Sequence, residues 1–170
     1  GADFRIKDDG TEFLKLGNSS SDAVIEASVQ DKDILFKGND GGAAVTALTL
    51  DMSAGGQATF NASVIAKTDT DTSNTGNVTL DFTANQNFVL TLTGNTTLVN
   101  PSTETVGQSG FIAFIQDGTG GRTVTLGTDY ETAAGAGLSL TSTASATDLV
   151  PYVVVAANRI LLGTPQLAFS

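Results

Sequence analysis

Cysteine and histidine are both missing from this sequence of 170 residues. Without cysteine the chain has no disulfide framework and no thiol chemistry. Without histidine it lacks the side chain that most often serves as a general base and as a metal ligand. We therefore expect no catalytic residues, no metal and no cofactor. The lack of disulfides does not fix a compartment, because large all-β assemblies are stable outside cells without them.

Basic residues are scarce. Eight lysines and arginines stand against eighteen aspartates and glutamates, which gives a net charge of −10. After Lys67 the only cations are Arg122 and Arg159. Because neutralising phosphates requires a cluster of basic side chains, we expect neither nucleic acid nor an anionic membrane surface as a partner.

Long apolar runs are also missing. No segment approaches the roughly 18 consecutive apolar residues that a membrane-spanning helix needs, so we expect no membrane insertion. No signal peptide is visible. Because the first residue is Gly1 instead of Met, we expect the sequence to be part of a longer chain.

Short apolar stretches and turn residues dominate what remains. Apolar residues make up 40% of the chain, which is enough for a core. Gly, Thr, Ser and Asn are abundant and strong helix formers are scarce, a balance that favours strands and turns. The composition predicts an all-β fold, with room for one domain and a smaller appendage.

An internal repeat occupies residues 1–67. Asp3–Gly10 aligns with Asp33–Asp40, and Phe13–Leu16 aligns with Ala47–Leu50. Both copies end on Ala-Ser-Val, at residues 27–29 and 62–64. Each copy predicts a three-stranded β-meander with one apolar face, which a sheet of this size cannot bury alone. The face needs the next repeat or identical chains around an axis, and the alternative is two ordinary hairpins of one globular domain.

The rest of the chain divides into a linker at 68–77 and a head domain at 78–170. The linker segment has no apolar residue before Val78 and is rich in side chains that bond their own backbone. About eight short strands follow at roughly ten-residue spacing, which predicts an antiparallel β-sandwich of jelly-roll type.

The centre of that sandwich is predicted to be a β-hairpin within Gly110–Leu126. Its first strand, Phe111–Gln116, is apolar on both faces, and the second, Thr123–Leu126, alternates hydroxyl and aliphatic side chains. The glycines of Asp117–Gly121 supply the turn. Elsewhere, Gly94-Asn95 reads as a turn and Leu138–Thr141 as a strand.

Few residues suggest a site. Asp69–Ser73 places oxygen side chains at alternate positions, but the Gly and Glu of a calcium loop are missing. The glycines 118, 120 and 121 favour a hairpin turn over a phosphate cradle, because no helix and no P-loop lysine follow. No spacing singles out a carboxylate pair for glycoside hydrolysis among Glu104, Asp117, Asp129 and Glu131. Tyr130, in a long loop, is the candidate ligand-binding residue because an exposed ring can stack on a sugar, whereas Tyr152 reads as core.

Both halves of the chain resemble phage tail fibres and related virion appendage proteins, especially those of marine phages. The segments that resemble the fibre repeats of such proteins are Asp33–Gly42, Leu48–Ser53 and Gly56–Phe60. The order of segments in the C-terminal half is similar to that of a module at the end of such proteins. These segments are Asn87-Phe88, Leu98–Pro101, Gly107–Gly110, Gln116–Arg122 and the strand of Tyr152. The resemblance implies a homotrimeric, non-enzymatic virion component that reaches towards the host surface, and it implies no individual site residue.

These features predict a structural virion protein, a tail fibre or appendage, that assembles as a trimer and contributes to host attachment. Its expected partners are copies of itself, other virion proteins and a glycan or protein of the host surface. Two alternatives stay open, a capsid-decorating virion protein and a carbohydrate-binding module of a secreted bacterial adhesin or enzyme.

Overall fold

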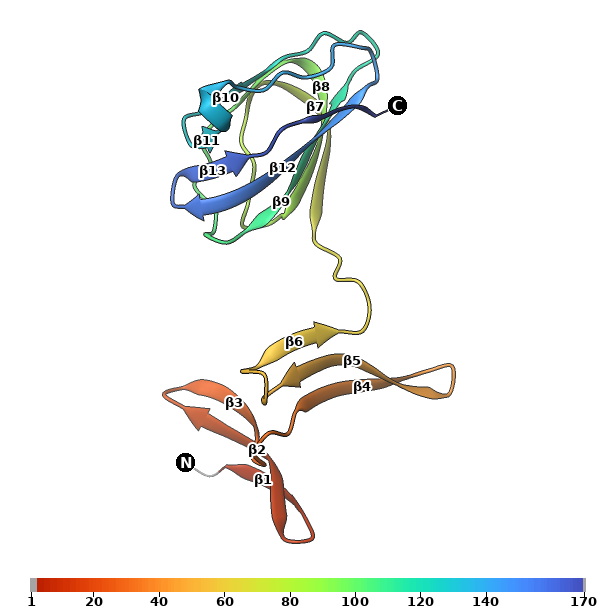
Figure 1. The fold of residues 1–170 in the computed structure, drawn as a ribbon, viewed down its shortest axis with the longest axis vertical. Helices are drawn as coiled ribbons and strands as arrows, with labels where there is room; N and C mark the ends of the chain where they lie inside the picture. Colours follow the sequence, from red (N-terminus) through yellow and green to blue (C-terminus); the bar gives the residue numbers. More distant parts are fainter. Residues whose placement is uncertain (1–2, 170) are drawn as a thin grey trace. The chain divides into compact units, whose positions relative to one another are not determined.

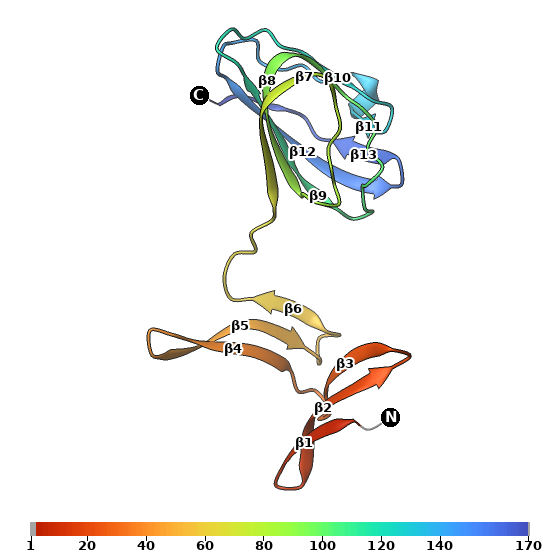
Figure 2. The same cartoon turned by 180° about the vertical axis from the view of Figure 1, so that it is seen from behind.

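The chain folds almost entirely into β-strands. The computed structural model describes residues 3–169 and contains no α-helix in that range, only a single 3₁₀ turn at Ala133–Gly135. Two compact units follow one another, Gly1–Ile65 and Ala66–Ser170 (Figures 1 and 2). The predicted all-β class is confirmed.

The N-terminal unit holds two three-stranded antiparallel meanders. The first orders β1, β2 and β3 side by side, and the second does the same with β4, β5 and β6 (Figure 1). Their bounds are β1 Phe4–Asp8, β2 Thr11–Ser19, β3 Asp22–Ala27, β4 Ile34–Asp40, β5 Ala43–Asp51 and β6 Gln57–Phe60. The predicted pair of β-meander repeats is confirmed.

The strand register shows that the two meanders are equivalent. Phe4 lies opposite Leu16 in the first, and Ile34 lies opposite Leu50 in the second. Both first hairpins shift register at the same place, directly before a lysine, Lys7 or Lys37.

The expected alignment of the two Ala-Ser-Val segments is wrong by two residues. The N–H of Ser28 donates to the carbonyl of Phe13 at 3.2 Å, and the N–H of Asn61 donates to the carbonyl of Ala47 at 3.0 Å. Ser28 therefore corresponds to Asn61, which places Ala62 beyond the end of the third strand. The two tripeptides have the same sequence, but the register of the sheet decides which residues are structurally equivalent.

Each meander has one apolar face, because cross-strand partners in an antiparallel sheet point to the same side. We call these the meander faces: Phe4, Ile6, Leu14, Leu16, Ile25 and Ala27 in the first, and Ile34, Phe36, Leu48, Leu50, Ala58 and Phe60 in the second. The opposite side of the first meander is charged, with ion pairs from Arg5 to Glu12 at 3.0 Å and from Lys15 to Glu26. No residue between 3 and 65 is buried.

The C-terminal unit contains one curled eight-stranded sheet (Figures 1 and 2). Its strands are β7 Thr68–Val78, β8 Asn87–Leu98, β9 Ser109–Gln116, β10 Val124–Leu126, β11 Tyr130–Glu131, β12 Thr147–Ala156, β13 Arg159–Leu162 and β14 Gln166–Phe169. Inside the curl lies the core, which includes Phe82, Phe88, Leu90, Ile112, Phe114, Val150, Tyr152, Val154 and Ile160.

The sandwich prediction expects a purely antiparallel sheet. The pairing of this sheet is instead mixed. β8 runs parallel to β7, β9 and β10, while β12 runs antiparallel to β9, β13 and β14. A residue pattern of period two reports which face of a strand is buried, but it does not report the direction of the neighbouring strand.

The predicted hairpin within Gly110–Leu126 is wrong. β9 is an interior strand of the sheet, as expected, but it does not pair with β10. Instead, β9 pairs with Phe88–Leu92 of β8 and β10 pairs with Thr96–Leu98 of the same strand. This is possible because β8 does not turn at Gly94-Asn95 but continues to Leu98, which leaves room for both partners one after the other.

Two further expectations are corrected. The segment expected as a linker at 68–77 is β7, which pairs with β8 along most of its length. Its polar residues misled the prediction, because backbone hydrogen bonds hold this strand and only Asn74 is buried in it. The segment Leu138–Thr141 is not a strand, although Leu138 and Leu140 pack partly against the core.

Candidate functional site

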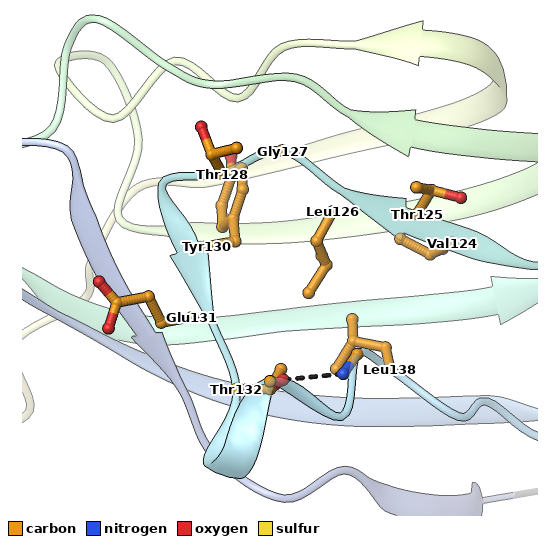
Figure 3. Close-up of a pocket in the computed structure, with 11 residues that line it drawn as sticks. Val124, Thr125, Leu126, Gly127, Thr128, Tyr130, Glu131, Thr132 and Leu138 are labelled. Carbon is orange, nitrogen blue, oxygen red and sulfur yellow. Dashed lines mark hydrogen bonds between the residues drawn. The ribbon is translucent and has the colours of Figure 1, made fainter.

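A pocket lies between β10 and β11, the two strands at the ends of the sheet order (Figure 3). It has a volume of about 620 Å³, and the segment from Thr132 to Leu138 forms its other wall. Tyr130 lines it with its ring. Threonine hydroxyls and glycine backbone make up much of the remaining lining.

Tyr130 is not the exposed aromatic that the sequence predicts. It lies in β11, is 5% exposed and belongs to the core cluster. Burial raises the pKa of its hydroxyl, and the negative charges of Glu104 and Asp129 raise it further. Among residues 3–169 the hydroxyl has no hydrogen-bond partner. A sugar-stacking role for Tyr130 stays a prediction, and the burial of its ring does not favour it.

Tyr152 is a core residue with an anchored hydroxyl. It is 3% exposed, and its ring meets that of Phe82 edge-on at a centroid distance of 5.3 Å. Its hydroxyl donates to the carbonyl of Gln86 at 2.6 Å. Burial raises its pKa to about 12. Tyr152 therefore ties the strand β12 to the loop before β8.

The candidate carboxylates have structural partners. Arg159 donates to Glu131 at 2.7 and 2.9 Å, and this hydrogen bonding lowers the pKa of Glu131. Glu104 accepts the N–H of Asn158 at 3.0 Å. These contacts close a turn and join strands.

The glycine cluster is a closed turn between β9 and β10. Asp117 accepts the N–H groups of Thr119 and Gly120 at 3.0 and 2.9 Å. The side chain of Gln116 accepts the N–H of Arg122 at 2.8 Å and donates to its carbonyl at 2.9 Å. Because side chains already occupy these backbone donors, the loop does not offer them to a phosphate.

The segment considered as a calcium loop, Asp69–Ser73, lies inside the strand β7. An extended strand points alternate side chains to opposite faces, so it does not wrap them around one ion. Within residues 3–169 there is no group of three or more acidic side chains that could hold a metal.

A second surface is built by the outward side chains of the C-terminal sheet. Residue pairing gives a row of Val89, Ala113 and Leu149 across three strands, and Phe111 lies opposite Pro151 in the next row. We call this surface the outer face; it comprises Val89, Phe111, Ala113, Ile115, Leu149, Pro151, Val153, Leu161 and Phe169.

Part of the outer face is predictable from the sequence, and the rest is not. The two-sided apolar character of β9 was expected from Phe111–Gln116. The contribution of β12 and β13 was not, although the unbroken apolar run from Leu149 to Ala157 was its signal. In the chain alone, Val153 is 37% exposed and Phe169 is 50% exposed.

A helix with the length and hydropathy for crossing a bilayer does not occur within the described range, 3–169.

Comparison with known proteins supports a relation to phage tail fibres. Residues 75–155 match the family described as "Putative phage tail fibre C-terminal domain". The match spans β8, β9, β10, β11 and most of β12, and therefore the pocket beside Tyr130 and the part of the outer face that lies on β8, β9 and β12. Neither the curated proteins nor the solved structures gave a match. The resemblance to phage tail fibre proteins is confirmed for this part of the chain.

Proposed function

We propose that this chain is a structural component of a phage tail fibre, that it assembles as a homotrimer, and that the assembly contributes to host attachment. The similarity of residues 75–155 to a tail fibre C-terminal domain supports the first part. The virion is then its place of action, and no enzymatic step is part of the role.

The observation that carries the assembly is the state of the N-terminal meanders. Twelve apolar side chains form the two meander faces, yet none of the residues 3–65 is buried. Burying one Val, Leu, Ile or Phe side chain contributes about 1.5–3 kcal/mol, so covering these faces yields most of the stability that such sheets can have. Copies of the same chain supply equivalent faces in equal number.

Three copies suit the attachment role. Weak contacts with a host glycan or protein become effective when one assembly presents several of them at once. The chain also has no disulfide to stabilise a small sheet, because it contains no cysteine. Burial of apolar side chains between subunits stabilises the sheets instead.

Light scattering on the purified full chain tests the assembly. We expect a particle of three times the 17.3 kDa of one chain, stable on dilution into the low micromolar range. A monomer at every concentration would contradict the proposal, and a monomer that binds sugars on a glycan array would favour a carbohydrate-binding module.

Adsorption tests the attachment role separately. The labelled protein is incubated with a panel of bacterial strains, and bound fluorescence is compared with that of a variant that stays monomeric. We expect the trimer to bind a subset of strains and the monomeric variant to bind them far more weakly. A trimer that binds no strain of a panel containing the phage's host would contradict the attachment role while leaving the structural one in place.

A further inference from the structure

The outer face of the C-terminal sheet is apolar, although the core of this unit lies on the opposite side. Phe88, Ile112 and Val150 point inwards, and all three are fully buried. Their neighbours in sequence, such as Phe111 and Leu149, point outwards and are only half-buried. A sheet with one face in water normally alternates apolar and polar residues, so two apolar faces indicate that both become covered.

Charge is absent from the two central strands of this face. β9 contains no ionisable side chain, and the only one in β12 is Asp148. Asp148 points inwards, where its carboxylate accepts the N–H groups of Thr141 and Ala168 at 2.5 and 2.8 Å.

The overall charge makes this neutrality informative. With a net charge of −10, two copies of the chain repel one another wherever acidic side chains come together. Over β9 and β12 they meet without bringing like charges into contact and without burying an unpaired charge. Self-association through this face therefore avoids repulsion between like charges.

We propose that the outer face is a contact surface between copies of this chain, with Phe111 and Leu149 on its central strands β9 and β12 and with Val153 and Leu161 beside them. This inference rests on the proposed assembly and names a surface for it in the C-terminal unit, independent of the meander faces. Each subunit buries the face against its neighbours, and β9 becomes covered on both sides.

A chain without cysteine allows a direct test, because one substitution introduces the only thiol. Val153→Cys places it on the outer face, and Thr125→Cys places it on an exposed position of β10 as the matched control. A maleimide reagent is added to the assembled full-length protein, and each labelling rate is divided by that of the same variant unfolded in urea.

We expect the thiol of the Val153→Cys variant to react about tenfold or more slowly than that of the control, because a covered group reacts only when the contact opens. Each variant is first shown to be trimeric by light scattering and to melt near the parent. If Val153→Cys does not fold, Leu161→Cys provides the same test in the paired strand.

Failure of this inference is distinct from failure of the proposed assembly. A stable trimer in which both thiols react equally fast overturns the outer face as the contact and leaves the assembly intact. A thiol that is accessible in the purified trimer but protected in intact virions assigns the face to another virion protein, which also overturns the proposal. A monomer overturns both.

Discussion

Arg122 donates two hydrogen bonds to one carboxylate oxygen of Asp117, from Nε at 3.1 Å and from Nη2 at 2.8 Å. This contact lowers the pKa of Asp117, and the N–H of Gly120 lowers it further. The pair sits at the turn between β9 and β10, where the chain passes from one partner segment of β8 to the next.

The first prediction concerns acid stability. The pKa of Asp117 is lower in the folded state than in the unfolded state. Asp117 therefore stabilises the fold at pH values above its ordinary pKa of 3.8. This contribution disappears as the pH falls through the folded-state pKa. We expect Asp117→Asn to be less stable than the parent at pH 7 and the difference to shrink towards pH 2, measured by urea unfolding. A difference that stays constant with pH would show that the charge of Asp117 is not what holds the turn.

The second prediction concerns Gly120 in the same turn. Its φ is +74°, and a Cβ there would overlap the carbonyl oxygen of Ser142 and lie 2.7 Å from the N atom of Ala144. An unfavourable backbone conformation alone costs about 1–3 kcal/mol, and we expect Gly120→Val to lower the free energy of unfolding by more than that. Gly118→Val is the control, because a Cβ at Gly118 meets open space. Equal melting temperatures for the two variants would contradict the turn geometry.

The third prediction concerns the core beneath β9. Phe114 is 1% exposed and pairs with Leu90 of β8. We expect Phe114→Ala to lower the free energy of unfolding by about 3–5 kcal/mol, because it leaves a large cavity. Urea unfolding at a fixed protein concentration measures this, since assembly makes stability concentration-dependent. A loss below about 1 kcal/mol would show that Phe114 does not lie in a packed core.

The fourth prediction concerns Asp148, which is 2% exposed. Its carboxylate accepts hydrogen bonds from the N–H groups of Thr141 and Ala168 and so joins β12 to a loop and to β14. Asp148→Ala leaves both N–H donors without their partner. Each donor that stays buried and unpaired costs about 1–3 kcal/mol of stability. We expect faster hydrogen exchange at Ala168 in the variant, while the core amide of Ile112 keeps most of its protection. Unchanged exchange at Ala168 would show that Asp148 does not hold β14.

Strand partners in the meanders could be predicted from the sequence, whereas strand partners in the C-terminal sheet could not. The alternation of Phe4 with Ile6 and of Ile34 with Phe36 fixes the meander faces, because each hairpin partner lies close in sequence. The parallel pairing of Phe88 with Ile112 spans 24 residues and leaves no local pattern.

The outcome for individual residues follows the same rule. The strand β7 was missed because its side chains are polar and its stability comes from backbone pairing with β8. The sequence predicts a long loop at Tyr130 because β11, with only two residues, is too short to be recognised as a strand. Its burial depends on packing against core residues from distant strands such as Ile160, with which it pairs.

The fifth prediction concerns the second meander face. Leu48 lies opposite Phe36 in β4 and Phe60 in β6, at the centre of the apolar side. Thr49 lies beside it in sequence and points to the other side, opposite Leu35 and Thr59. We expect Leu48→Asp to convert the trimer into smaller species by light scattering and Thr49→Asp to leave the trimer intact.

The size of the effect separates assembly from an isolated chain. In a lone chain Leu48 is half-buried at most, and a surface substitution of this kind changes stability by about 0.5 kcal/mol. In an assembly the new carboxylate is enclosed by apolar side chains of neighbouring subunits, and an unpaired buried charge costs several kcal/mol. A full loss of the trimer with Leu48→Asp, next to an unchanged Thr49→Asp, therefore requires that copies of the chain cover this face. Two variants with equal and small effects would mean that the meander faces stay in water.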